Sequence, residues 1–208
     1  NFWNGKEMVV FDAEKNEAVP FDNFVPPKMR DLFINTITLN SLEDPSKKDG
    51  NPTEMAILKY LAFCKFPVVD HRNKFEKIYQ ATFSSDRKRM STVVGLPNGQ
   101  MIAFIKGASE YVMQISDKFL DFDSDAEVPI TPALRKVFEE AIEGMAGKAL
   151  RTIGLAYKII NNKEELHVDK PDERGIFDYE KSGFTMLGIC GIKDIIRAEV
   201  PDSVRKCY

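Results

Sequence analysis

Two short segments carry side chains that could together bind a nucleotide. The run from Phe83 to Ser91 (FSSDRKRMS) joins an aromatic ring to three consecutive cations, and Lys106 to Glu110 (KGASE) places a lysine before small residues. An aromatic face can stack on a purine base, and cations can hold its phosphates. Small residues after the lysine would let a ligand approach the backbone. We therefore predict a nucleotide pocket around Phe83 and Lys106. A core phenylalanine and a solvated charge run are the structural alternatives.

The sequence contains no glycine-rich phosphate loop of the G-x-x-x-x-G-K-[ST] or G-x-G-x-x-G type. Backbone amides are therefore not expected to wrap the phosphates. The affinity for nucleotide should be modest, with a Kd of ~0.1–10 mM.

Metal chemistry finds little support in the sequence. Three scattered cysteines and two isolated histidines predict reduced thiols, packing or surface imidazoles, and no zinc site. Asp121, Asp123 and Asp125 copy the first half of a calcium-binding EF-hand loop. Ala126 stands where that loop needs glycine, and Pro132 where it needs glutamate. The segment is interpreted as a solvated acidic loop, and no metal ligand is expected.

The composition is that of a folded domain. The chain has 208 residues, of which 43% are hydrophobic, and its formal net charge is −3. This apolar content argues against disorder, and the acidic balance argues against a nucleic-acid partner. No apolar run approaches the ~18–20 residues of a membrane span, so no direct membrane contact is expected.

The order of the expected elements indicates an α+β fold, with a mostly antiparallel twisted β-sheet flanked by helix pairs. A hairpin turn is expected at Pro97-Asn98-Gly99, and helix starts at Pro26-Pro27, Asn51 and Thr131. Strands are expected at 8–11, 78–83, 91–96, 100–105, 153–160 and 184–192, helices after each of the three starts and at 109–115, and an acidic loop at 117–129.

Five segments in a fixed order resemble the nucleotide-binding (N) domain of P-type ATPases, above all that of plasma-membrane-type calcium pumps. They are Gly50 to Glu54 (GNPTE), Phe83 to Ser91, Lys106 to Glu110, Leu150 to Thr152 (LRT), and Gly191 to Asp194 (GIKD) leading to Arg197. The resemblance covers essentially the whole chain. Phe-Ser-x-x-Arg-Lys-x-Met-Ser together with Lys-Gly-Ala-x-Glu is a specific pair, because both motifs are long and their order is fixed.

The resemblance implies a role for each matched position, with ATP, as Mg-ATP, for the ligand. No catalytic residue is implied within the chain. Phe83 would stack on adenine, and Glu54 would accept from its amino group with Thr53 beside it. Lys106 would line the deep end of the base pocket, with Gly107 after it as a further binding residue. Lys88 and Met90 would flank the nucleotide, Arg151 would reach the phosphates and Asp194 would meet the ribose.

Three positions leave alternatives open. Glu54 also completes an Asn-x-x-Glu capping box with Asn51, so a purely structural role is equally favoured. Ser85 stands where related pumps of internal membranes carry a phosphate-binding arginine. That phosphate contact is either absent here or supplied elsewhere, with Arg87 and Arg89 as the candidates. In the hinge segment, Ile195-Ile196 replaces a proline-containing pair.

The resemblance further implies a nucleotide-binding domain over 1–190 and, over 191–208, a hinge returning to a phosphorylation domain. Such a domain is a cytosolic part of an integral protein of the plasma membrane or an internal membrane. Its partners are the phosphorylation and actuator domains of the parent chain. It would present the ATP γ-phosphate to an aspartate upstream of Asn1, since both ends look cut from a longer chain.

The Asp-Lys-Thr-Gly-Thr acceptor motif and the Thr-Gly-Glu loop of this family are absent from the sequence. The fragment should therefore bind ATP without hydrolysing it. The alternatives are a stand-alone nucleotide-sensing module and the same domain from a pump of other cation specificity.

Overall fold

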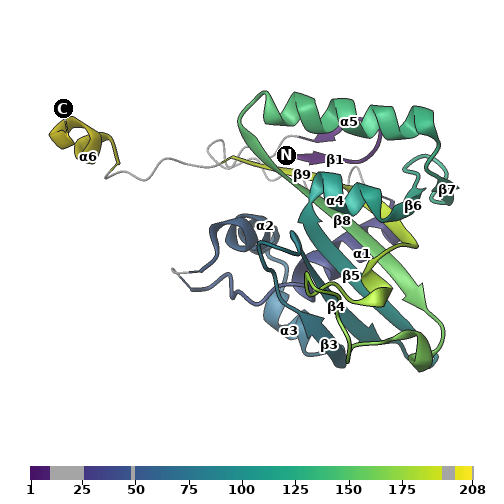
Figure 1. Cartoon of the computed structure of the whole chain (residues 1–208). Helices are drawn as coiled ribbons and strands as arrows, with labels where there is room; N and C mark the ends of the chain where they lie inside the picture. Colours follow the sequence, from purple (N-terminus) through teal and green to yellow (C-terminus); the bar gives the residue numbers. More distant parts are fainter. Residues whose placement is uncertain (10–25, 48–49, 194–199, 208) are drawn as a thin grey trace.

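A nine-stranded β-sheet organises the chain, with helices on both of its faces (Figure 1). The computed structural model describes residues 1–9, 26–47, 50–193 and 200–207. The main path of the sheet runs in the order β2-β1-β9-β8-β5-β4-β3. The strands are β1 (Phe2–Trp3), β2 (Met8–Val9), β3 (Lys77–Ala81), β4 (Arg89–Gly95), β5 (Met101–Ala108), β6 (Ser116–Leu120), β7 (Glu127–Pro129), β8 (Leu150–Ile160) and β9 (Phe184–Lys193).

Within the described ranges, the strand pairs are antiparallel with one exception, the parallel pair of β6 and β9. The predicted α+β class with a mostly antiparallel sheet is therefore confirmed. The helices are α1 (Pro27–Thr38), α2 (Pro52–Phe63), α3 (Val68–Arg72), α4 (Ser109–Gln114), α5 (Pro132–Ala146) and α6 (Val200–Cys207), with short 3-10 turns η2 (Lys163–Glu165) and η3 (Asp178–Glu180).

Neighbouring residues of the central strands face different helices, because side chains alternate across a sheet. Val94 and Phe104 pack in one hydrophobic cluster with α1 and α2. Val93 and Ile105 pack in another with Val112 of α4. A third cluster joins α5 to β9 and β1. The sheet is thus the middle of three layers, and residues at alternate positions of β5 reach α2.

Local signals placed the main elements correctly. Thr131 caps α5 by accepting from the Leu134 amide at 3.2 Å, as its helix-start pattern predicts. Gly147 is the C-cap of the same helix. The β4–β5 hairpin turns at the predicted place, with Gly99 at φ +82°. Glycine tolerates this left-handed conformation without a steric penalty.

Several expectations were wrong. Residues 117–129 are not one loop, because β6 and β7 form a hairpin on either side of Asp121 to Ala126. The strand expected at 78–83 ends at Ala81. The short β1 and α3 were not predicted at all.

The end of β9 bears on the predicted domain boundary at residue 190. This strand stays paired with β8 up to the register Leu150↔Lys193. The boundary itself remains a prediction. Among the described residues, no helix has the length and apolar character that a bilayer crossing requires.

Candidate functional site

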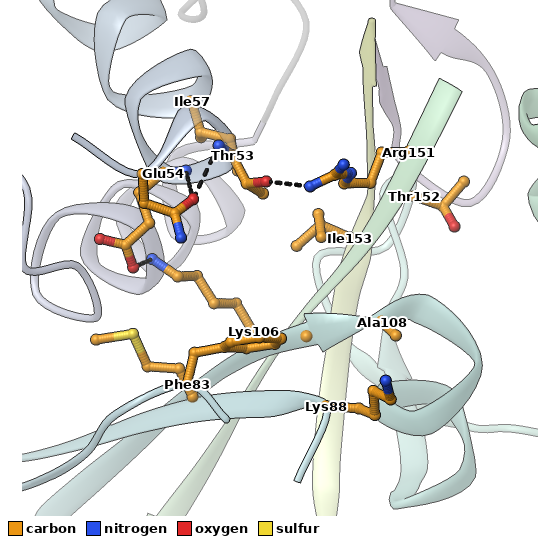
Figure 2. Close-up of a pocket in the computed structure, with 13 residues that line it drawn as sticks. Thr53, Glu54, Ile57, Phe83, Lys88, Lys106, Ala108, Arg151, Thr152 and Ile153 are labelled. Atoms are coloured by element: carbon orange, nitrogen blue, oxygen red, sulfur yellow. Dashed lines mark hydrogen bonds and ion pairs between the residues drawn. The ribbon is translucent and has the colours of Figure 1, made fainter. Parts of the chain in front are cut away.

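A pocket of about 230 Å³ opens between α2 and the sheet (Figure 2). Its walls are the first turns of α2, the loop between β3 and β4, the end of β5 and the start of β8. Eight of the nine predicted nucleotide-binding residues line it, namely Thr53, Glu54, Phe83, Lys88, Met90, Lys106, Gly107 and Arg151. The ninth, Asp194, lies outside the described residues, as do Ile195, Ile196 and Arg197.

A buried ion pair forms the floor of the pocket. Lys106 shares the α2-facing side of β5 with Phe104, two residues earlier. Its Nζ lies 2.8 Å from Glu54 Oε1, with the two side chains 9% and 11% exposed. The ammonium also donates to Ser41 Oγ. Desolvation lowers the pKa of Lys106 below its ordinary value, and the Glu54 carboxylate opposes that shift.

Glu54 does not complete the predicted capping box. The cap itself is present, because Asn51 Oδ1 accepts from the amides of Thr53 at 3.0 Å and Glu54 at 3.3 Å. The Asn51 amide, however, donates to Glu43 Oε1 at 2.8 Å. Glu54 Oε2 instead accepts from the Leu42 amide at 3.0 Å. The glutamate is therefore held at the pocket floor by two separate segments.

Phe83 stands at the pocket as an exposed aromatic ring. It lies two residues beyond the end of β3 and is 54% exposed, whereas Phe104 on β5 is 1% exposed. The interpretation of Phe83 as a core residue is therefore wrong. A half-exposed ring on a pocket wall offers a face on which a flat ligand can stack.

Lys88 and Arg151 place positive charge around the pocket (Figure 2). Arg151, at the start of β8, donates from Nη1 to Thr53 Oγ1 at 2.9 Å and so links the sheet to α2. Lys88 is exposed, and its backbone adopts φ +55°. Its carbonyl accepts from the Ala108 amide at 3.0 Å, which ties the loop to the end of β5.

Arg87 and Arg89 do not face the pocket. They are 6% and 5% exposed, and Arg87 forms a buried ion pair with Glu180. Arg89 Nη1 donates to the Glu180 carbonyl oxygen at 3.0 Å. The prediction that one of them replaces the phosphate contact missing at Ser85 is therefore wrong. The alternative of a solvated charge run fails for the same two residues.

Gly107 is explained by its neighbouring strand. A Cβ on Gly107 would lie 2.3 Å from the Lys88 carbonyl oxygen and 2.8 Å from Arg89 Cα. Real Cβ atoms do not come this close to backbone, so only glycine fits here. The sequence suggested that a ligand would approach the backbone closely at Gly107. In the structure, the β4 backbone approaches it instead, on the side of Gly107 where a side chain would otherwise lie.

Sequence reasoning missed several contributors. Ile57 and Ile153 add apolar surface to the pocket, and Ser41 completes the Lys106 contacts. Ile57 was detectable, because it follows Glu54 by three helical positions and so shares its face. Ser41 follows α1 in an irregular segment, where no periodic pattern operates.

The cysteines and one histidine can be followed in the structure. Cys64, Cys190 and Cys207 are free thiols. His71 Nε2 forms a hydrogen bond with Asn35 Oδ1 at 2.6 Å. Across the described ranges, no group of three or more acidic, histidine or cysteine side chains could hold a metal ion.

Comparison with known proteins gives a consistent result. The sequence pattern of the family described as "P-type ATPase, cytoplasmic domain N" matches residues 31–199. The chain is 36% identical over 188 residues to the probable calcium-transporting ATPase 9, plasma membrane-type, of Oryza sativa subsp. japonica, covering 86% of this chain and 16% of that protein.

Animal proteins match over a similar extent. The plasma membrane calcium-transporting ATPase 4 of Homo sapiens is 34% identical over 207 residues, covering 91% of this chain and 16% of that protein. The plasma membrane calcium-transporting ATPase 2 of Oreochromis mossambicus is 33% identical over 215 residues, with coverages of 97% and 19%. The chain therefore spans less than a fifth of the length of these relatives.

Proposed function

This chain belongs to the family of P-type ATPase cytoplasmic N domains, and we propose that its pocket binds ATP, delivered as Mg-ATP. The observation that carries the proposal is the joint presence, in one pocket, of the exposed Phe83 ring and the buried Lys106–Glu54 pair. A purine needs a ring to stack on and polar groups at its edge. These three side chains offer both.

The base would enter the pocket and the phosphates would stay outside it. Ligand pockets commonly measure ~300–1,000 Å³, and this one, at about 230 Å³, is smaller. It suits the base better than a whole triphosphate. Glu54 can accept from the adenine amino group, because a carboxylate has about four acceptor positions. Lys106 Nζ and the Leu42 amide contact different oxygens of Glu54, Oε1 and Oε2 respectively.

The phosphates would meet Lys88 and Arg151, the cations around the opening. Both side chains are exposed and both line the pocket. Among the described residues that line the pocket, Lys88 and Arg151 offer cations to the phosphates. We expect the magnesium ion to arrive bound to the nucleotide, because Mg²⁺ is usually held in large part by substrate phosphates. Met90 and Gly107 would flank the ligand, and Asp194 would reach the ribose from the hinge segment.

We further propose that the parent protein is a calcium-transporting P-type ATPase, as the names of its relatives suggest. In that protein, residues 1–190 would form the nucleotide-binding domain and 191–208 the return to the phosphorylation domain. The domain would hold ATP so that its γ-phosphate reaches an aspartate in the phosphorylation domain, with the actuator domain as a further partner. The protein would lie in the plasma membrane or an internal membrane, with this domain in the cytosol.

The experiment is an NMR titration of the chain with Mg-ATP. Wild-type resonances of the pocket residues should shift and give a Kd of ~0.1–10 mM. Phe83→Ala should raise this Kd about 5- to 150-fold, because stacking on an aromatic ring contributes ~1–3 kcal/mol per base. Phe63→Ala is the matched control, because Phe63 is 39% exposed on α2 and does not line the pocket. Equal affinity of both variants and wild type would refute the pocket.

The same samples test the absence of hydrolysis. The chain should release no phosphate from Mg-ATP above the rate of the buffer, since it lacks the acceptor motif of the family. Steady phosphate release that Phe83→Ala abolishes would contradict this part of the proposal.

A further inference from the structure

Glu180 is a fully buried carboxylate that connects two distant parts of the chain. It lies in the 3-10 turn η3 and is 0% exposed. Its Oε1 accepts from Arg87 Nη2 and from Ser91 Oγ, and its Oε2 accepts from the Phe177 amide at 3.1 Å. Its backbone carbonyl accepts from Arg89 Nη1 at 3.0 Å. One residue thus holds both arginines that flank Lys88.

Arg87 extends this anchor toward Phe83. Its Nη1 donates to the Thr82 carbonyl at 2.6 Å, and its guanidinium lies 5.6 Å from the centre of the Phe177 ring. Arg89 Nε donates to the Arg87 carbonyl at 3.1 Å. The planar guanidinium fork can make such contacts simultaneously, which a lysine ammonium cannot do with the same geometry.

Lys88 occupies the position between these two anchors in a conformation that needs support. Its φ of +55° is uncommon for a residue with a side chain. Arg87 and Arg89 point into the protein while Lys88 stays exposed at the pocket. The Lys88 carbonyl is fixed by the Ala108 amide at 3.0 Å. The backbone of Lys88 is therefore held on both sides and at its own carbonyl.

We propose that Glu180 is a positioning residue for ATP binding, which acts by fixing Arg87 and Arg89 and thereby holds Lys88 toward the phosphates. The inference rests on the proposed function, in which Lys88 contacts the phosphates. A purely stabilising role explains the geometry less well. Burying the Glu180 carboxylate with the Arg87 guanidinium gains little over an apolar core. What this network does specifically is to separate three consecutive cations. Arg87 and Arg89 become buried anchors, and Lys88 stays exposed.

The first test compares Glu180→Gln with wild type in binding ATP and adenosine, with Glu127→Gln as a control. Glu127 also holds an ion pair and a tyrosine hydrogen bond, but it lies outside the pocket. Glu180→Gln should raise the Kd of ATP about three- to fivefold, the size of one partly exposed charge contact. The Kd of adenosine, which has no phosphates, should change less than about twofold. Glu127→Gln should leave both unchanged.

A second variant covers the case in which Glu180→Gln does not fold. Arg87→Lys keeps the buried charge pair but loses the fork that reaches Thr82, so it should show the same selective loss of ATP affinity. In a Lys88→Ala background, Glu180→Gln or Arg87→Lys should no longer weaken ATP binding, because the group through which the anchor acts is gone.

Three results would overturn the inference: equal weakening of ATP and adenosine, an undiminished effect in the Lys88→Ala background, or wild-type ATP affinity in both anchor variants. Failure of the proposed function would look different, since wild type itself would then bind no ATP.

Discussion

Replacing Glu54 by glutamine would leave the Lys106 ammonium buried without its anionic partner. The two side chains are 9% and 11% exposed, and their charged atoms lie 2.8 Å apart. Removing one partner of a buried pair costs ~3–5 kcal/mol. Ser41 Oγ and the new amide oxygen still accept from the ammonium, so we expect a smaller loss of about 2–3 kcal/mol in the free energy of unfolding.

The loss should depend on pH in a defined direction. Burial lowers the pKa of Lys106 below 10.5, and Glu54 raises it. Between the folded-state pKa and 10.5, the unfolded chain binds more protons than the folded chain, so the contribution of Lys106 to stability increases as pH rises. Without Glu54, this window extends to lower pH. The deficit of Glu54→Gln should therefore shrink between about pH 7 and about pH 10.

Urea unfolding at several pH values would measure the effect in wild type, Glu54→Gln, Lys106→Met and the double variant. The double variant retains every other group that titrates in this pH range. Comparing the four proteins therefore isolates the contribution of the Lys106–Glu54 pair. The exposed pair Lys118–Glu127 is the control, with an expected coupling below about 1 kcal/mol. Two results would refute the interpretation of the pocket floor as a buried ion pair. One is that Glu54→Gln lowers the free energy of unfolding by no more than the coupling of the control pair. The other is that this loss stays constant with pH.

Two further predictions concern packing and burial. Gly107→Ala should lower the free energy of unfolding by ~1–3 kcal/mol, because its Cβ would lie 2.3 Å from the Lys88 carbonyl oxygen. Gly144→Ala, in α5, would place its Cβ within 4 Å of no atom other than those of its sequence neighbours and the nearby helix backbone, and it should instead raise the free energy of unfolding by ~0.5–1 kcal/mol. Urea curves that give both changes the same sign would contradict the packing argument. Burial raises the pKa of the Cys190 thiol to about 12, so iodoacetamide should label the exposed Cys207 at neutral pH and spare Cys190. Equal labelling of the two cysteines in mass spectra of the folded protein would mean that the core around Cys190 opens to the reagent.

Features encoded by neighbouring residues could be predicted from the sequence. The Asn51 and Thr131 caps each depend on contacts within three positions, so a short pattern suffices. The hairpin at Gly99 is similarly local. The resemblance to a family allowed predictions about residues far apart in the sequence. It indicated the eight described residues that the pocket brings together.

Features encoded by distant residues could not be predicted. Arg87 and Glu180 are 93 positions apart, and no residue near Arg87 in the sequence indicates that a buried carboxylate will contact it. A run of three cations is usually solvated, so the local pattern pointed the wrong way. The β6–β7 hairpin was missed for a related reason. Its strands are short, and β6 owes its place to the parallel pairing with β9.

The distribution of charge in the pocket favours one orientation of a bound nucleotide. Lys106 and Glu54 at the floor carry opposite charges 2.8 Å apart, so their fields largely cancel toward the opening. Lys88 and Arg151 at the exposed rim are both positive, while the whole chain carries a net charge of −3. A triphosphate therefore gains more at the rim than at the floor. The floor instead suits a neutral base edge that both donates and accepts. With the base inside, the phosphates would extend outward, as the presentation to another domain that we propose would require.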